Sequence, residues 1–372
     1  MTERALRVAW LGHKSATLGG GMATYSAEIT AGLRQRGVRV VHFHHGDDEE
    51  EETGESVPLS SLAVVKPLVI SPRRARRKLE DRLRKREFDL VHASFWFSSL
   101  DFNLPKLCRQ LGIPIVATFH VAFDSRLSLW GGITSATYRV YSRALAQCNR
   151  VIVFGEAQRD ILAGLGVPDG ILRVLPNGVD IEKYQPGESD ALTRFGARRL
   201  FVYMGRLDSE KNVDTLVRAF LATAPPDGIR LLLVGSGTER KRLQRQFQDG
   251  RVVFAGHVGD ERMRIDILRA ADAFFLPSSV EGLSLAMLEA MACGVATVAT
   301  DVGGDGDALR GAGIVLNPSN LEEELQLAIR ELIELPWLCR KLGELARERA
   351  VKRYSLDRNL DSLIQLYQEL VA

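Results

Sequence analysis

Short apolar runs alternate with helical segments along the whole chain, and this alternation limits the folds open to it more than any other feature. Neighbouring parallel strands need a crossover connection, usually a helix, so the pattern predicts doubly wound parallel sheets of the α/β class. The predicted strands of the first half are residues 7–11, 38–43, 90–92, 115–119, 150–153 and 172–175. Those of the second half are residues 200–204, 230–234, 252–255, 273–276, 296–299 and 313–316.

Chain length suggests that this pattern is divided between two domains. A chain of 372 residues is longer than one hydrophobic core usually supports. We expect two Rossmann-like domains, residues 1–185 and 186–354, with the cleft between them as the default ligand site. The second domain begins after the turn-forming segment Pro186-Gly-Glu-Ser. Residues 357–370 carry apolar side chains at helical spacing and predict a C-terminal helix.

Composition is that of a globular protein and gives no argument for nucleic-acid binding. Hydrophobic residues make up 45% and charged residues 26%, and the formal net charge is only +2. No apolar run approaches the roughly 18 residues of a membrane span, and the N-terminal apolar run predicts a first strand rather than a signal peptide. The four cysteines lack metal-type spacing, so we expect reduced cysteines in a cytoplasmic protein.

Two glutamates mark the strongest candidate for a ligand site. Glu281 follows the predicted strand 273–276, at the carboxyl end where open α/β sheets bind ligands. Glu289 lies about two turns further on, within a predicted helix at residues 285–292 that Gly294 ends. Carboxylates accept paired hydrogen bonds from neighbouring hydroxyl groups, so the pair indicates a bound sugar or ribose.

The loop after residues 200–204 fits an anionic ligand. It contains Gly205, Arg206 and Lys211, and a helix follows it. A fixed Arg guanidinium together with a Lys ammonium group stabilises negative charge on a bound ligand.

Glycines follow two other predicted strands, and the two groups predict different roles. Gly19-Gly20-Gly21 lies between the first strand and a helix expected to begin near Tyr25, where backbone N–H groups could approach an anion. Gly235 and Gly237 lack the spacing of a dinucleotide fingerprint, so they favour close packing of strand and helix. His120 ends the predicted strand 115–119, at an edge of the sheet where it could contact a ligand.

These motifs together resemble those of one enzyme family. The stretch Glu281-Gly-Leu-Ser-Leu-Ala-Met-Leu-Glu289-Ala-Met-Ala-Cys-Gly294 is similar to the signature of retaining glycosyltransferases of the GT-B fold, specifically glycosyltransferase family 4 (glycosyl transferases group 1). The resemblance implies two Rossmann-like domains facing a central cleft, with a C-terminal helix, residues 355–372, packed back on the first domain. The implied activity is transfer of a sugar from a UDP- or GDP-type nucleotide-diphosphate sugar to an acceptor hydroxyl.

The resemblance also implies roles for individual residues. Glu281 would lie beside the donor sugar, Glu289 would bind the ribose, and His120 would contact the sugar near the reacting carbon. Arg206 and Lys211 would bind the diphosphate, and backbone groups beside His257 and Val258 would meet the nucleobase. The implied catalytic residues are Glu281, His120, Arg206 and Lys211, and the implied donor-binding residues are Gly20, Gly21, Gly205, Arg206, Lys211, Val258, Glu281, Gly282, Leu283, Ser284, Leu285 and Glu289.

The resemblance implies retention of configuration without a dedicated protein base. In that mechanism the leaving phosphate helps to deprotonate the acceptor hydroxyl on the same face of the sugar. No carboxylate pair resembles a metal-binding Asp-x-Asp motif, and Arg206 and Lys211 supply positive charge, so we expect no metal and no other cofactor. One position departs from the family: Asp307 stands where Glu is usual after Gly303-Gly304. The segment Pro176-Asn-Gly-Val-Asp resembles the family's interdomain turn.

The acceptor is open between a glycolipid, a polysaccharide and a small-molecule glycoside. The basic segment from Arg73 to Arg86 either docks on the inner face of an anionic membrane, as in some relatives that glycosylate lipids, or forms a solvated outer helix packed through Leu79 and Leu83. The loop at residues 122–132, which contains Asp124, is expected on the acceptor side.

Three other interpretations are kept as alternatives. A GT-B phosphorylase would consume inorganic phosphate, and a nucleotide-sugar epimerase would need no acceptor. A catalytically silent sugar-nucleotide-binding protein would have no need of the charged residues named above. Separately, His42, His44 and His45 beside the acidic run 47–52 could suggest a metal cluster, but a solvated strand end followed by an acidic loop is favoured.

Overall fold

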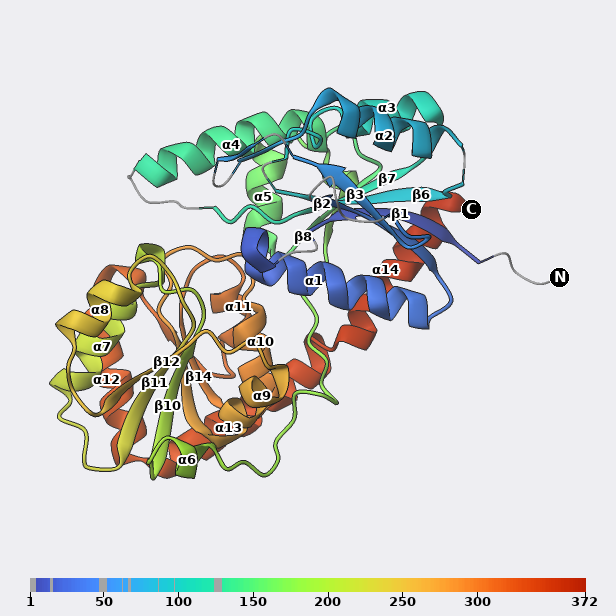
Figure 1. The fold of residues 1–372 in the computed structure, drawn as a ribbon. Coiled ribbons are helices and arrows are strands. Elements are labelled where there is room, and N and C mark those ends of the chain that lie inside the picture. Colours follow the sequence, from blue (N-terminus) through green and yellow to red (C-terminus); the bar gives the residue numbers. More distant parts are fainter. Residues whose placement is uncertain are drawn as a thin grey trace. The chain divides into compact units, whose positions relative to one another are not determined.

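The chain forms two compact units in the computed structural model, which describes residues 5–13, 16–46, 52–61, 63–65, 68–85, 87–96, 98–123 and 129–372 (Figure 1). The first unit comprises residues 1–176 together with 359–372, and the second comprises residues 177–358. The division between Pro176 and Asn177 falls inside the segment that resembles an interdomain turn.

The first unit contains a parallel sheet. Its described strands lie in the order β3-β2-β1-β6-β7-β8-β9, and each neighbouring pair is parallel. A separate antiparallel pair, β4 and β5, precedes the second helix. The strands are β1 (Arg7–Gly12), β2 (Arg39–Gly46), β3 (Ser56–Ser60), β4 (Ala63–Val65), β5 (Leu68–Ile70), β6 (Leu90–Phe95), β7 (Ile115–Phe119), β8 (Arg150–Val153) and β9 (Leu172–Val174).

The second unit contains a parallel sheet of its own, in the order β12-β11-β10-β13-β14-β15. The order reverses between β10 and β13, which makes the carboxyl ends of these two strands the expected ligand position. The strands are β10 (Arg199–Met204), β11 (Ile229–Val234), β12 (Val252–Gly256), β13 (Ala271–Leu276), β14 (Ala296–Thr300) and β15 (Ile314–Leu316).

Helices cover both faces of each sheet (Figure 1). Among the described residues, no helix combines the length and apolar character that crossing a membrane requires. The helices are α1 (Ala16–Gln35), α2 (Arg73–Arg84), α3 (Leu104–Leu111), α4 (Leu129–Leu145), α5 (Glu156–Gly164), α6 (Ala191–Arg194), α7 (Val213–Ala222), α8 (Arg240–Gln246), α9 (Glu261–Ala270), α10 (Leu285–Ala292), α11 (Asp305–Leu309), α12 (Leu321–Glu334), α13 (Pro336–Arg353) and α14 (Leu356–Val371), with short 3₁₀ turns at Asp169–Ile171, Ser209–Lys211 and Pro318–Asn320.

The α/β prediction is confirmed strand by strand, with small differences at the strand ends. The predicted helix at residues 285–292 is α10, with the same bounds. One strand of the first sheet, β3, was not predicted. It contains Pro58, which has no N–H for a ladder, but β3 is an edge strand, where proline is tolerated.

The start of the first helix differs from the prediction. α1 begins at Ala16, so the glycine run from Gly19 to Gly21 lies inside the helix rather than in a loop before Tyr25. The N–H groups without an intrahelical partner belong to the first four residues of a helix. The amides of Gly20 and Gly21 are not among them. The predicted start near Tyr25 is wrong because the glycines adopt helical conformation despite their low helix propensity.

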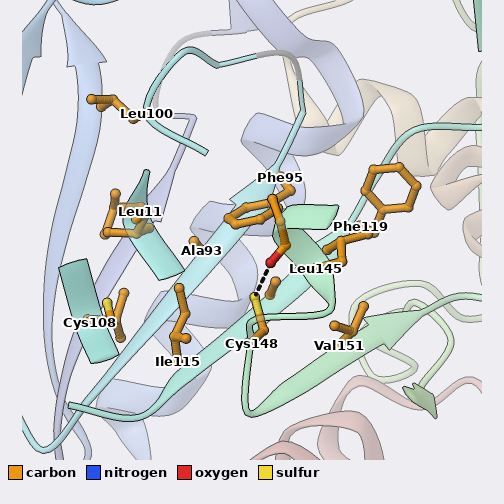
Figure 2. Close-up of a cluster of buried hydrophobic side chains, with 14 of the residues drawn as sticks. Leu11, Ala93, Phe95, Leu100, Cys108, Ile115, Phe119, Leu145, Cys148 and Val151 are labelled. Carbon is orange, nitrogen blue, oxygen red and sulfur yellow. Dashed lines mark hydrogen bonds between the residues drawn. The ribbon is translucent and has the colours of Figure 1, made fainter. Parts of the chain in front are cut away.

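The core of the first unit lies on the face of the sheet that α2, α3 and α4 cover. Phe95 and Phe119 of the central strands pack there with Leu145 of α4 (Figure 2). Cys148 Sγ donates to the Ala144 carbonyl at 3.7 Å, and burial raises the pKa of the Cys148 thiol far above its usual range. All four cysteines are buried and free of disulfides, as the scattered spacing predicted.

α14 contributes its apolar stripe to the opposite face of the first sheet. Tyr367 Oη contacts His92 Nδ1 at 2.5 Å, and the His92 ring stacks on Trp10. Leu360 packs so closely on α1 that a Cβ on Gly32 would lie 2.3 Å from a Leu360 methyl carbon. α14 therefore packs into the core of the first unit, although it is the last helix in the sequence.

Candidate active site

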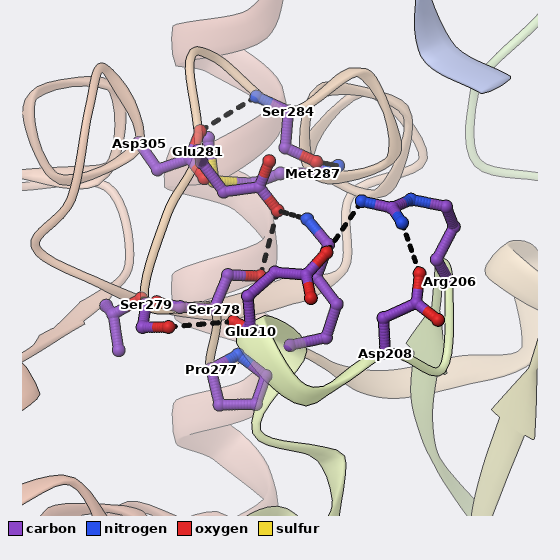
Figure 3. Close-up of polar contacts among 12 residues, drawn as sticks. Arg206, Asp208, Glu210, Pro277, Ser278, Ser279, Glu281, Ser284, Met287 and Asp305 are labelled. Atoms are coloured by element: carbon purple, nitrogen blue, oxygen red, sulfur yellow. Dashed lines mark hydrogen bonds and ion pairs between the residues drawn. The ribbon is translucent and has the colours of Figure 1, made fainter. Parts of the chain in front are cut away.

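Two loops of the second unit meet where the strand order of its sheet reverses. β10 and β13 are adjacent parallel strands, so the loops that follow them, residues 205–212 and 277–284, leave the sheet at the same edge. Figure 3 shows side chains from these loops pointing toward one another. This edge is where open α/β sheets bind ligands.

Lys211 and Glu281 form the central contact of this edge. Lys211 Nζ donates to Glu281 Oε1 at 2.5 Å, and Ser278 Oγ donates to the same oxygen at 2.8 Å. Only 12% of the Lys211 side chain and 15% of the Glu281 side chain are exposed. Partly buried charges are screened far less than exposed ones, so each charge fixes the position of the other.

Arg206 lies in the same loop as Lys211 but has different partners. Its guanidinium contacts the Asp208 carboxylate and donates to Glu210 Oε1 at 2.7 Å (Figure 3). The side chain is 62% exposed. The structure therefore brings Lys211 and Glu281 together, whereas Arg206 is turned toward two carboxylates on its own loop.

Main-chain contacts hold the two loops in register. The Glu210 carbonyl accepts the Ser279 N–H at 2.8 Å and the Ser279 hydroxyl at 3.0 Å. Asn212 Nδ2 donates to the Pro277 carbonyl at 2.9 Å, and Asn212 has the left-handed backbone conformation that asparagine tolerates. These bonds fix the distance between Lys211 and Glu281 independently of their charges.

Gly235 and Gly237 allow a third loop to pack against this site. A Cβ on Gly235 would lie 1.8 Å from the Gly205 carbonyl oxygen, and one on Gly237 would lie 2.4 Å from the Leu207 carbonyl. The Leu207 N–H donates to the Ser236 carbonyl at 2.9 Å. The glycines thus serve close backbone packing, which sets the position of the loop that begins at Gly205.

The loop from Glu281 to Ser284 is held by the segment after β14. The Gly304 N–H donates to the Gly282 carbonyl at 2.5 Å, and a Cβ on Gly303 would lie 2.1 Å from the Glu281 carbonyl oxygen. Asp305 Oδ1 accepts the Ser284 N–H at 2.8 Å. Gly303 also has φ near 56°, which favours glycine.

α10 begins directly after this loop. Ser284 is its N-cap, and the Ser284 hydroxyl accepts the Met287 N–H at 3.3 Å. The Leu283 carbonyl accepts a bond from Asn177 Nδ2 at 2.7 Å. Glu289 lies on α10, five residues after Ser284, and is 8% exposed. Burial, with a smaller contribution from the Glu289 charge, raises the pKa of the Cys293 thiol to about 12.

The end of β12 carries the position implied for the nucleobase. Val258 follows β12 by two residues, and its carbonyl accepts a bond from Arg264 Nη1 at 3.3 Å. The same guanidinium nitrogen donates to the Gly259 carbonyl at 3.2 Å. The turn at Val258 is therefore anchored on α9.

His120, Gly20 and Gly21 belong to the first unit. His120 follows β7, and its ring packs edge-on against Tyr25 with ring centroids 4.9 Å apart. His120 Nε2 is buried without a hydrogen-bond partner among the described residues. Burial, with a smaller effect of His13, lowers the pKa of His120 to about 3, so the imidazole is neutral at physiological pH.

The histidines of β2 are buried, so the prediction of a solvated strand end is wrong for them. His44 Nε2 contacts Ser56 Oγ at 3.0 Å and His45 Nε2 contacts Ser98 Oγ at 3.1 Å. The unpredicted strand β3 pairs with β2 along these residues. In the part of the chain that the structure describes, no three His, Cys, Asp or Glu side chains gather as a metal site requires. Residues 47–51 and Asp124 lie outside the described residues.

Sequence reasoning missed two polar side chains of this site. Ser278 is fully buried and its hydroxyl donates to Glu281, and Asp305 is 1% exposed and accepts the Ser284 N–H. Asp305 lies in the segment that begins at Gly303, and its place there could have marked it as a site residue. The sequence motif singled out only Asp307 in that segment. Asp307 is exposed and pairs with Arg310 at 2.6 Å.

Comparison with known proteins identifies the family. The models described as Glycosyltransferase Family 4 and Glycosyl transferases group 1 match residues 19–183 and 198–335. The chain belongs to glycosyltransferase family 4. D-inositol 3-phosphate glycosyltransferase of Saccharomonospora viridis is 29% identical to this glycosyltransferase over 398 residues, covering 95% of this chain and 90% of that protein.

Solved structures of glycosyltransferases share the fold. Sucrose-phosphate synthase from Thermosynechococcus elongatus matches with a TM-score of 0.79 at 23% identity, covering 98% of this chain and 99% of that one. HepE of Anabaena, solved in complex with UDP-glucose, matches with a TM-score of 0.78 at 18% identity, covering 98% and 100%. These likenesses confirm the predicted GT-B architecture of two parallel-sheet α/β domains.

Proposed function

We propose that this glycosyltransferase is retaining and metal-independent, and that it moves a sugar from a UDP- or GDP-type nucleotide-diphosphate sugar to an acceptor hydroxyl. The observation that carries the proposal is the Lys211–Glu281 pair at the reversal point of the second sheet. An ammonium group beside a carboxylate suits a donor that joins an anionic leaving group to a hydroxylated ring.

Positive charge for the leaving diphosphate comes from Lys211 and Arg206. Lys211 is already fixed by its bond to Glu281. Arg206 is exposed and pairs with Asp208 and Glu210, and exposed ion pairs are weak enough for a diphosphate to replace them. A guanidinium binds two phosphate oxygens at once, so the exchange strengthens the interaction.

The rest of the donor binds along α10. The N–H groups at the amino end of the helix, after Ser284, can donate to sugar or phosphate oxygens. Glu289 would accept the ribose hydroxyls, and the turn at Val258 would contact the base. HepE, whose solved complex contains UDP-glucose, supports a UDP-type donor.

Retention is supported by the weakness of His120 as a base. The pKa of His120, lowered to about 3 by burial, makes its imidazole a poor proton acceptor. We assign His120 a contact with the donor sugar, and Glu281 the position beside that sugar. The leaving phosphate would then take the acceptor proton on the same face.

Peripheral contact with an anionic membrane is the proposed function of α2. Ala75, Leu79 and Leu83 form its buried stripe, as expected for a helix on the sheet. Of its basic residues, Lys78 and Arg82 each pair with Glu52 at 3.1 Å, and Arg84 pairs with Glu80 on the same helix. The exposed ones are Arg73, Arg74, Arg76, Arg77, Arg84 and Lys85. Such a helix favours a lipid acceptor over a soluble one.

A screen of nucleotide sugars by thermal unfolding tests the donor proposal. A ligand that binds only the native state stabilises it by about 2.7 kcal/mol at one hundred times its Kd. We expect UDP-glucose or a GDP-sugar to raise Tm without added magnesium. Stabilisation by inorganic phosphate and a sugar phosphate, with none by any nucleotide sugar, would favour a phosphorylase instead. Conversion of the bound nucleotide sugar to its epimer without an acceptor would favour an epimerase.

A further inference from the structure

Asp305 is a buried carboxyl next to the Lys211–Glu281 pair, and the proposed reaction gives it no role. It is the first residue of α11 and is 1% exposed. Its Oδ1 accepts the Ser284 N–H (Figure 3), whereas its Oδ2 is buried and has no hydrogen-bond partner among the described residues. A carboxylate in such a place would be poorly compensated.

Of the two neighbouring carboxyl groups, Glu281 has the better hydrogen-bonding partners for a negative charge. Glu281 receives an ammonium group and a hydroxyl donor on one oxygen, while Asp305 receives a single backbone N–H. Two carboxyl groups that share one cation do not readily ionise together. Burial, followed by the charge of Glu281, raises the pKa of Asp305 well above its usual value, while the Ser284 N–H and Lys211 oppose the rise.

Few other charged groups act on Asp305. Tyr354, after α13, interacts with it electrostatically and is itself mostly buried. On the same helix, Asp307 is exposed and paired with Arg310 at 2.6 Å. Asp301 lies beside the start of the same helix, since a Cβ on Gly306 would be 1.8 Å from Asp301 Oδ1, and it pairs with Arg310 at 2.9 Å. Among the described residues, Glu281 and Lys211 are the charged groups that act most on the ionisation of Asp305.

We propose that Asp305 is a positioning residue for the donor loop, residues 281–284, and that it must carry its proton to hold the Ser284 amide without adding a second negative charge beside Glu281. The inference rests on the proposed donor site. Ser284 caps α10, and Gly304 bonds Gly282, so a displaced Asp305 moves the loop and the helix start together. A charged Asp305 would also repel the donor diphosphate.

Two variants separate the proton from the charge. Asp305→Asn keeps an oxygen for the Ser284 amide and stays neutral at every pH, whereas Asp305→Ala removes the acceptor. Asp249→Asn is the matched control, because Asp249 also accepts a backbone N–H, from Arg251 at 2.8 Å, but at the start of β12, at the other end of the second unit's strands. The measurement is calorimetric affinity for UDP-glucose from about pH 6 to about pH 9.5, a range that spans the titration of a strongly raised carboxyl.

We expect wild-type affinity to fall at the alkaline end and that of Asp305→Asn to stay constant there. Asp305→Ala should bind about tenfold more weakly than wild type at about pH 6, the effect of one unsatisfied N–H, and its affinity should not fall at the alkaline end. Asp249→Asn should follow wild type. Loss of binding in Asp305→Asn equal to that in Asp305→Ala would overturn the inference, and so would parallel pH profiles of wild type and Asp305→Asn.

Unfolding in urea decides the inference even if UDP-glucose does not bind, a result that would count only against UDP-glucose as the donor. Because the folded-state pKa of Asp305 is raised, the native state holds a proton that the unfolded chain releases. Wild-type stability should therefore fall as pH rises above the ordinary carboxyl range, until the folded pKa is passed. Asp305→Asn should lack this fall. The same slope in both proteins would show that Asp305 is ionised and would overturn the inference.

Discussion

Lys211 and Glu281 lie 70 positions apart in the sequence, and their side chains meet at 2.5 Å where two neighbouring strands end. The pair joins the loop after β10 to the loop after β13. A ligand that displaces either charge therefore acts on both loops. Because the pair is largely buried, removal of one partner also leaves the other uncompensated, and stability and activity must be measured separately.

Lys211→Ala should lower the rate of donor turnover by about 10²-fold, because the ammonium group stabilises charge that grows on the leaving diphosphate. The same change should reduce the free energy of unfolding by about 2–4 kcal/mol, since it leaves Glu281 partly buried and unpaired. Addition of Glu281→Gln should restore most of the stability but not the activity. Recovery of both in the double variant would show that Lys211 has only a structural role.

Arg206 and Glu210 should respond in opposite directions. Arg206→Ala should reduce turnover by about 10²-fold, because a bidentate contact to the leaving group is lost. Glu210→Gln should strengthen binding of UDP several-fold, since it removes a competing carboxylate from an exposed ion pair worth about 0.2–1 kcal/mol. Calorimetry with UDP measures the second effect. Weaker binding by Glu210→Gln would mean that the pair with Arg206 is part of the ligand-bound arrangement.

Glu289→Ala should weaken binding of the free nucleoside diphosphate by about 1.5–3 kcal/mol, the value of hydrogen bonds to a charged acceptor. Glu344→Ala, an exposed glutamate on α13, is the control and should leave the affinity unchanged. Titration of both variants with UDP compares them directly. Equal affinities would remove Glu289 from the nucleotide site.

Charge reversal on the outer face of α2 should abolish sedimentation with vesicles that contain anionic lipid, since each basic residue near such a surface contributes about 1 kcal/mol. Reversal of Lys341 and Lys352 on α13 is the control and should leave sedimentation unchanged. Wild-type protein that stays in the supernatant at low salt would favour a soluble acceptor. The residues to reverse are Arg73, Arg74, Arg76 and Arg77.

The fold was predictable because each buried strand is a short apolar run between helical segments. β3 escaped the prediction since Pro58 weakens the strand signal, and only pairing with β2 gives the strand its place. The start of α1 was predicted wrongly because glycine is normally unfavourable within helices, and the tertiary structure overrides that preference here. Both failures concern tertiary contacts that no local pattern contains.

The site shows the same limit at the level of single side chains. The sequence placed Lys211 and Glu281 in the loops after two predicted strands, and the structure shows that these strands are neighbours and that the two side chains meet. Spacing could not reveal that Arg206 pairs with Asp208 and Glu210, because that depends on rotamers of an exposed loop. It also missed Asp305, whose importance lies in its burial rather than in its position in the motif.

The configuration of the released sugar tests the central claim most directly. Proton NMR of the anomeric signals during turnover of UDP-glucose, an α-linked donor, reports the first product formed, whether the acceptor is an added hydroxyl compound or water. Retention by same-face attack predicts that the α-anomeric product appears first. If water is the acceptor, the released glucose then equilibrates with its β-anomer only later. A β-linked product formed directly from the α-donor would contradict the account and would require a protein base on the opposite face of the sugar.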